Sequence, residues 1–246
     1  QLLEQTDITE KTRQEILTEK ARMHLMLQHF NEARSTLGQL KDPGKYEMEW
    51  LALCREYAAL KPDDEALLPD GDLARLLNHT GTINRDLCAF LYFHYANENP
   101  KVVPEEHIEL VAVMLSRLNE LNEERIPALK LSKRAEGYHL DLSHTPYSTF
   151  LVTIPLVYRA NILQPLNLYS LDISHTPVSL VRELKQLKVK ELRMVGVSLE
   201  PINTLPWTLK GMGLERVILG KGEYPESIIK NIRYKGIEVV EEEHEH

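Results

Sequence analysis

Two copies of one polar heptad are the part of this chain whose side chains are best suited to chemistry. Residues 140–146 read Leu-Asp-Leu-Ser-His-Thr-Pro, and residues 171–177 read Leu-Asp-Ile-Ser-His-Thr-Pro. His144 and His175 are candidates for a paired metal or catalytic site, because imidazole serves both roles. Thr followed by Pro is also typical of a turn after a strand. We favour the turn, so the two histidines are expected to have no chemical role.

Other catalytic motifs are incomplete. Residues 84–87 read Asn-Arg-Asp-Leu, but the His of the kinase catalytic loop is replaced by Asn84 and its metal-binding Asn by Leu91. Gly220-Lys221-Gly222 lacks the first Gly, the spacer and the Ser/Thr of a P-loop. We therefore predict that the chain itself is not an enzyme and that it has no catalytic residues, no cofactor and no metal.

The heptads belong to a longer pattern of short strands. Alternating apolar residues follow anchors spaced roughly 20 to 30 residues apart, which is the spacing of leucine-rich repeats. Each such strand leaves its apolar side unburied unless neighbours stack on it. The pattern therefore predicts a stack with a shared interior. The anchors are Leu140, Leu171, Leu192, Val217 and Ile237.

Residues 171–192 resemble the leucine-rich-repeat segments of large bacterial serine/threonine protein kinases. Both share a Leu-x-Ile/Leu-Ser-x-Thr-Pro-Val-Ser start, followed by leucines through Leu184, Leu187 and Leu192. The resemblance covers roughly the last 110 residues. It implies an accessory, non-catalytic region of a multidomain protein.

The outward side chains of these strands are the candidate partner-binding residues. Residues that alternate with the apolar anchors should form a row across a parallel sheet, with strands about 4.8 Å apart. Stacked repeats often bind proteins on such a surface. The candidates are His139, Asp141, Ser170, Asp172, Glu191, Arg193, Arg216, Ile218 and Glu238.

The first half of the chain has a helical pattern throughout. Apolar residues recur at helical spacing, and residues 87–96 are apolar on all sides, as in a central helix. We expect an α+β protein. Residues 1–125 form an all-α helical bundle or loosely tetratricopeptide-like helical-repeat domain, and residues 126–246 form a short, irregular leucine-rich-repeat solenoid with a parallel sheet, whose first strand lies within residues 126–131.

Composition narrows the range of partners and compartments. Net charge is −8, which disfavours contact with nucleic acid or with anionic membranes. The two cysteines, Cys54 and Cys88, make no disulfide framework and no zinc site. We expect a cytoplasmic protein with a protein partner.

Three functions remain open at this stage. The first is a protein-interaction or scaffold module, part of a larger signalling protein, because the chain begins at Gln1 without Met. The second is the regulatory C-terminal region of a bacterial serine/threonine protein kinase whose catalytic domain precedes Gln1. The third is an enzyme with an unrecognised site around His79, Asn84 and Asp86. We favour the first.

Overall fold

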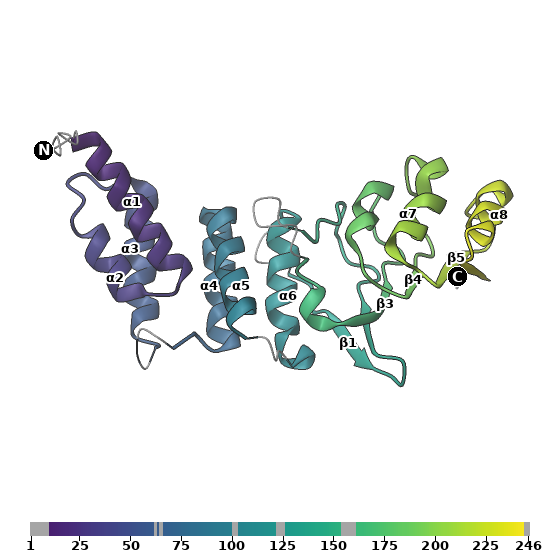
Figure 1. The fold of residues 1–246 in the computed structure, drawn as a ribbon, viewed down its shortest axis with the longest axis horizontal. Helices are drawn as coiled ribbons and strands as arrows, with labels where there is room; N and C mark the ends of the chain where they lie inside the picture. Colours follow the sequence, from purple (N-terminus) through teal and green to yellow (C-terminus); the bar gives the residue numbers. More distant parts are fainter. Residues whose placement is uncertain are drawn as a thin grey trace, which may run out of the picture. The chain divides into compact units, whose positions relative to one another are not determined.

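The chain is an α+β protein with its helices first and its sheet second. The computed structural model describes residues 10–61, 63, 66–99, 103–121, 126–153 and 161–243. Their contacts divide the chain into two compact units, Gln1–Asn99 and Pro100–His246 (Figure 1). Within these described residues, no helix combines the length and the apolar character needed to span a bilayer.

The first unit is helical, as the sequence predicts. Its second helix packs against the first and the third through Phe30, which is fully buried. Leu87 and Tyr92 are also buried, which confirms residues 87–96 as a central helix. The helices are α1 (Glu10–Met26), α2 (Phe30–Leu37), α3 (Lys45–Ala58), α4 (Asp70–Ile83) and α5 (Arg85–Glu98).

Asn84 explains why α5 begins where it does. Its backbone is extended, and its side-chain Oδ1 accepts the N–H of Leu87 at 3.0 Å. This is the N-cap arrangement that satisfies a main-chain donor at a helix start. Asp86 lies exposed in the first turn, where a negative charge favours the helix dipole. The Asn-Arg-Asp-Leu motif therefore has a structural role at a helix terminus.

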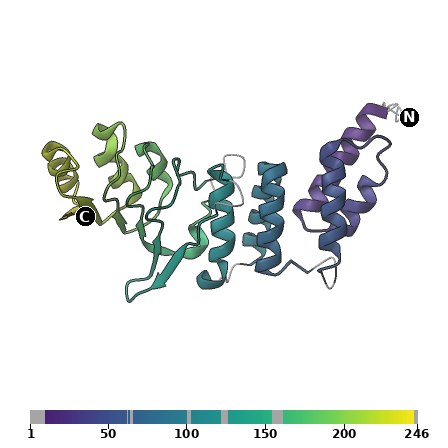
Figure 2. The same ribbon diagram turned by 180° about the vertical axis from the view of Figure 1, so that it is seen from behind.

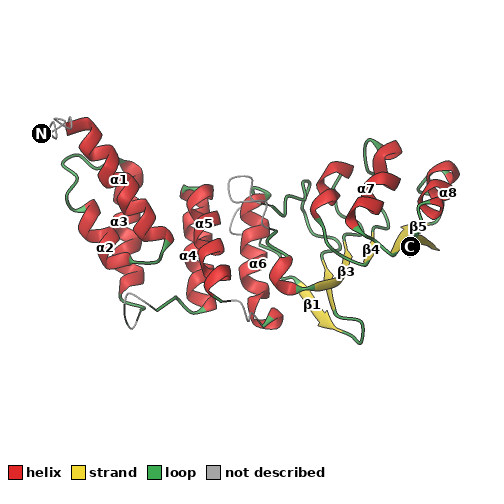
Figure 3. Cartoon of the chain, viewed as in Figure 1, coloured by secondary structure: helices red, strands yellow, loops and turns green. Residues whose placement is uncertain are grey.

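The second unit contains one sheet of six strands in sequence order, β1-β2-β3-β4-β5-β6. Strands β2 to β6 are parallel, and β1 pairs antiparallel with β2. Figure 3 shows α7 and α8 along the same side of these strands. The elements are α6 (Pro104–Leu118), β1 (Lys130–Lys133), β2 (Tyr138–Asp141), η2 (Gln164–Leu166), β3 (Leu168–Asp172), η3 (Val181–Gln186), β4 (Glu191–Arg193), η4 (Ile202–Thr204), α7 (Leu205–Met212), β5 (Arg216–Gly220), α8 (Glu226–Tyr234) and β6 (Glu238–Glu242).

The predicted anchors lie side by side in this sheet. Leu140 pairs with Leu171, Leu171 with Leu192, and Leu192 with Val217, and each is at most 1% exposed. The predicted fifth anchor, Ile237, is wrong by two residues, because Val217 pairs with Val239. The alternating apolar pattern around Ile237 fits either register, so the sequence alone does not separate them.

The heptads form the tight turns that end β2 and β3. In each heptad the Thr hydroxyl donates to the carbonyl three residues earlier, Thr145 to Leu142 and Thr176 to Ile173. The histidine adopts a left-handed backbone, with φ of 59° at His144 and 56° at His175. Histidine is one of the residues that tolerate this conformation best. The turn interpretation of the sequence is therefore confirmed.

Helix α6 belongs with the sheet, so the division between the units differs from the predicted boundary at residue 125. Its Ser116 Oγ lies 3.3 Å from Tyr147 OH. Asn119, which caps its C-terminus, donates to the carbonyl of Leu151 and accepts the N–H of the same residue. These bonds tie α6 to the loop after β2. Figure 2 shows the ribbon of α6 and of this part of the chain from behind. The polar residues 122–125, which suggested the boundary, lie outside the described residues.

Gly196 offers a direct test of the turn geometry. It occupies the position of His144 and His175 in the next turn, with φ of 71°, and a Cβ there would overlap Nδ1 of His175. We expect Gly196→Ala to lower the free energy of unfolding by about 1–2 kcal/mol, because it combines backbone strain with a clash. Denaturant unfolding of the full chain measures this.

The matched control is Gly211→Ala in α7. Gly211 has no atom within 4 Å of its built Cβ and does not have a positive φ. Alanine should therefore raise stability there by about 0.5–1 kcal/mol through its helix propensity. Equal effects of the two substitutions would contradict the assigned turn.

Candidate functional site

The candidate residues lie on the face of the sheet that points away from the apolar interior. Along each strand alternate side chains leave on opposite faces, so the residues between the anchors share one face. Strand register arranges them in two rows, which together we call the polar sheet face. The first row is Lys130, Asp141, Asp172, Arg193, Ile218 and Val240, and the second is Ser132, His139, Ser170, Glu191, Arg216 and Glu238.

Two of the predicted positions need correction. Glu238 was expected beside Ile218, but it pairs with Arg216 in the second row, and Val240 stands beside Ile218. This is the same two-residue shift that displaces the last anchor. Ile218 was expected to be exposed, yet it is only 7% exposed. His139 and Ser170 are each 8% exposed, so much of this face is covered by its own neighbours.

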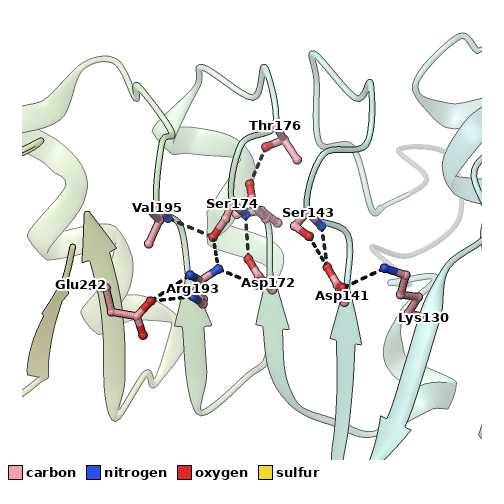
Figure 4. A network of polar contacts seen from close by, with 10 residues as sticks. Lys130, Asp141, Ser143, Asp172, Ser174, Thr176, Arg193, Val195 and Glu242 are labelled. Carbon is pink, nitrogen blue, oxygen red and sulfur yellow. Dashed lines mark hydrogen bonds and ion pairs between the residues drawn. The ribbon is translucent and has the colours of Figure 1, made fainter. Parts of the chain in front are cut away.

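Arg193 on β4 connects strands on both of its sides (Figure 4). Its Nη1 lies 3.0 Å from Asp172 Oδ2 on β3 and donates to Ser174 Oγ at 3.1 Å. Its Nε and Nη2 both donate to Glu242 Oε2 on β6, at 3.1 and 2.8 Å. The guanidinium therefore crosses β5 to reach β6. Such charge-assisted bonds are stronger than neutral ones, and they fix the orientation of all three side chains.

Ser174 joins this network to the main chain. Its hydroxyl, which is fully buried, also accepts the N–H of Val195 at 3.0 Å. Its own N–H donates to Asp172 Oδ1 at 2.8 Å. Removal of this hydroxyl would leave the buried Val195 donor without a partner. The second heptad therefore supports the turn after β4 as well as its own.

Further ion pairs link neighbouring strands on the same face. Arg216 Nη1 lies 3.0 Å from Glu191 Oε2, and Lys130 Nζ lies 3.8 Å from Asp141 Oδ2. Arg216 Nε also lies 3.8 Å from Glu238 Oε1, and all three pairs join directly opposed residues of adjacent strands. Exposed pairs of this kind contribute little to stability, about 0–1 kcal/mol each. Their main effect is a surface whose charges largely compensate one another.

Asp141 is held in its charged form by the first heptad. Burial alone would raise the pKa of its carboxyl, but hydrogen bonds from Ser143 outweigh burial and lower the pKa below its usual value of 3.8. The Ser143 hydroxyl donates to Oδ1 at 2.6 Å and the Ser143 N–H at 2.8 Å. Asp141 is therefore a fixed negative charge at neutral pH.

His139 is held in its neutral form. Its Nδ1 bonds the Ser170 hydroxyl, and its Nε2 is buried with no hydrogen-bond partner among the described residues. Burial, helped by the positive charge of Arg134, lowers the pKa of His139 below its usual 6.5. An imidazole in this environment contributes packing and one hydrogen bond to the sheet face, and no charge at neutral pH.

The sequence analysis missed three residues of this face. Glu242 and Lys130 come from strands whose register the repeat pattern did not fix, and Ser174 was assigned only to a turn. The signal for Ser174 was present, because both heptads place a serine two residues after an aspartate that can accept its N–H. No local signal could have found Glu242, since its partner Arg193 is remote along the chain.

The two heptad histidines meet but do not build a metal site. Their rings stack with centroids 4.7 Å apart and an interplanar angle of 15°. Both side chains are exposed at the ends of β2 and β3. In the described part of the chain, no group of three or more His, Cys, Asp or Glu side chains is placed to hold a metal.

The geometry defines the class of protein: a helical unit followed by a unit with a mostly parallel sheet, whose open face carries ion pairs between strands. Comparison of the chain with protein-family models, with curated proteins and with solved structures finds no match. Function therefore has to be inferred from this chain's own surfaces.

The role of Ser174 can be tested against its counterpart in the first heptad. Ser174→Ala should lower the free energy of unfolding by about 1–3 kcal/mol, because it leaves the Val195 N–H buried and unsatisfied. Ser143→Ala, whose hydroxyl bonds only the half-buried Asp141, should cost less than about 1 kcal/mol. Chemical denaturation measures both, and equal losses would contradict the assignment.

The neutral state of His139 predicts a pH dependence of stability. Unfolding restores its usual pKa of 6.5, so the unfolded state binds a proton that the folded state does not bind as pH falls through that value. Stability should be fully present above the unfolded pKa and decrease between about pH 7 and pH 5. His139→Gln should reduce this decrease.

Two comparisons make the pH experiment specific. His24 and His94, whose pKa values are also lowered by burial, remain in the variant, so part of the pH dependence should persist. His139→Asn should reduce the decrease by the same amount as His139→Gln, because both substitutions remove the imidazole. A His139→Gln profile identical to that of the wild-type chain would disprove the assignment.

Proposed function

We propose that this protein is a non-catalytic protein-interaction or scaffold module that binds a protein partner through the polar sheet face. One observation carries the proposal. The side chains of this face form an ordered, preoriented set of ion pairs, with Arg193 held from both sides by Asp172 and Glu242. Preoriented charges favour specific recognition of a complementary surface, because little side-chain entropy is lost on binding.

We further propose that β2 to β5 and the segments between them are stacked repeats of the leucine-rich type. Supporting this are the two heptads, which differ only at Leu142 and Ile173, the in-register anchors and the sequential parallel strand order. Repeats of this kind use the exposed sheet for binding. Cys54 and Cys88 are both buried and form no disulfide in the described part of the chain, which is consistent with a reducing, cytoplasmic location.

A second candidate rests on the resemblance of residues 171–192 to repeats of bacterial serine/threonine kinases. In that case this module regulates a catalytic domain encoded upstream of Gln1. The coding sequence before Gln1 tests this directly. A kinase domain in the same reading frame would support it, and any other content would reject it.

The interaction function is tested by charge exchange on the polar sheet face. The double variant Asp172→Arg/Arg193→Glu exchanges the charges of two directly opposed residues on β3 and β4. The two residues still carry opposite charges, but each strand presents the reverse charge to a partner. We expect the wild-type protein to retain a specific partner protein in a quantitative pull-down. The exchanged variant should retain at least tenfold less of this partner, because like charges then face each other across the interface.

The matched control exchanges Glu226 and Lys230 on α8, an exposed pair 3.7 Å apart. This variant has the same number of substitutions and the same net charge, so its pull-down should equal that of the wild type. Circular dichroism of each variant checks the fold. A partner retained equally by all three proteins would refute binding through this face.

A further inference from the structure

A groove separate from the polar sheet face lies between two loops of the second unit. It has a volume of about 720 Å³, within the range of ligand-binding clefts. One wall is the segment 196–203 after β4, and the other is formed by residues 223–225 after β5. Val197, Leu199 and Tyr224 give this groove buried apolar walls.

The wall at residues 197–200 has the burial pattern of an extended chain, and its last residue, Glu200, forms a parallel β-bridge with Leu180. Burial alternates along it, with Val197 and Leu199 buried and Ser198 and Glu200 exposed. In an extended chain, main-chain polar groups of alternate residues point to opposite sides. Glu200 points to the preceding loop, where its N–H donates to Ser179 O at 2.6 Å and its carbonyl accepts the N–H of Val181.

Leu199 must therefore point its N–H and carbonyl to the opposite side, toward the groove. Val197, two residues earlier, confirms the direction, because its carbonyl accepts the hydroxyl of Tyr224 across the groove at 2.6 Å. In the part of the chain that the structure describes, neither main-chain group of Leu199 has a hydrogen-bond partner. Almost every such group finds a partner in a folded protein, from protein or from water, so this pair is free to bind a ligand.

The chain itself shows how an occupant would dock. The residues around Leu180 bind along one edge of this strand in a parallel bridge to Glu200, with the two hydrogen bonds described above. On the other edge the described residues form no β-bridge, and the loop after β5 reaches this edge through the Tyr224 hydroxyl, which bonds Val197 two residues before Leu199. A second extended segment would extend the same pattern by one strand.

The charge of the groove lining indicates which kind of peptide segment would bind. Two charged residues line the groove, Glu200 and Glu223, and both are acidic. Glu223 is engaged, since its carboxylate accepts the N–H groups of Gly196 and Gly220. Glu200 is exposed at the rim, and no ion pair involves it among the described residues. A carboxylate in this position favours Lys or Arg in the occupant.

We propose that this groove binds an extended peptide segment of a partner protein, which carries an apolar residue for the groove floor and a basic residue for Glu200. The segment runs parallel to residues 197–200. It forms two main-chain hydrogen bonds with Leu199, one with its N–H and one with its carbonyl. The residue that donates to the Leu199 carbonyl is not proline. This site is distinct from the polar sheet face and does not depend on it.

The probe is the fluorescently labelled hexapeptide Lys-Val-Lys-Val-Lys-Ser, added to the full chain. Fluorescence polarisation should show saturable binding at least about tenfold tighter than for the same peptide with Glu in place of Lys. A version N-methylated at every amide, which has no main-chain donors, should also bind at least about tenfold more weakly. Amide hydrogen exchange should slow at Leu199 when the peptide is bound, whereas Glu200 should be protected already in the free protein.

Two variants separate the groove from non-specific attraction. Glu200→Lys should weaken the peptide about tenfold or more, because it reverses the charge at the rim. Glu136→Lys makes the same change at an exposed position that does not line the groove, and it should alter affinity less than about twofold. The peptide assay and the pull-down report on different surfaces, so loss of the peptide in Glu200→Lys and loss of the protein partner in the Asp172→Arg/Arg193→Glu exchange distinguish failure of this proposal from failure of the proposed function.

Several results would overturn the proposal. Absence of saturable binding up to about 1 mM peptide would do so, since that corresponds to only about 4 kcal/mol. Equal affinity for the Lys and Glu peptides, or unchanged Leu199 exchange at saturation, would do so as well. Concentration-dependent protection of Leu199 without peptide would identify a second copy of this chain as the occupant and would reject the basic peptide.

Discussion

The second unit depends on one constraint: no strand of its sheet can satisfy its main chain or bury its aliphatic side chains without the next strand. Leu171, for example, pairs with Leu140 on one side and Leu192 on the other, and its side chain is 1% exposed. Register must therefore be kept from strand to strand, since a shift of one residue would expose the apolar side chains. The turns maintain that register, which explains why the heptad hydroxyls bond main-chain atoms.

The same constraint governs the polar side of the sheet. Strands about 4.8 Å apart bring the outward side chains of neighbouring strands into contact, so like charges in one row would repel. Arg193 pairs with Asp172 and Glu242, and Arg216 with Glu191 and Glu238, which compensates most of these charges. Asp141 and Asp172 are like charges in directly opposed positions, and Lys130 and Arg193 neutralise them from the two outer sides. A surface ordered in this way is available for recognition without rearrangement. Structural and binding roles of these residues are thus compatible.

Sequence reasoning succeeded where local patterns carry the information. The helices of the first unit, four of the five anchors and the heptad turns all follow from periodicity or turn chemistry. It was wrong at Ile237, where alternation allows two registers, and it placed α6 apart from the sheet, because contacts such as that of Asn119 with Leu151 leave no periodic signature. The Arg193–Glu242 pair and the groove beside Leu199 arise from segments brought together only by folding.

The two ends of the sheet have a consequence for self-association. Among the described residues, β1 and β6 each have a neighbouring strand on one side only. Unpaired strand edges invite pairing with another molecule, and charged side chains are a common protection. Strand β6 carries Glu238, Glu241 and Glu242, whereas β1 carries Lys130 and Lys133. A strand added at either edge would have to displace or desolvate these charged side chains, which disfavours growth of the sheet through its ends.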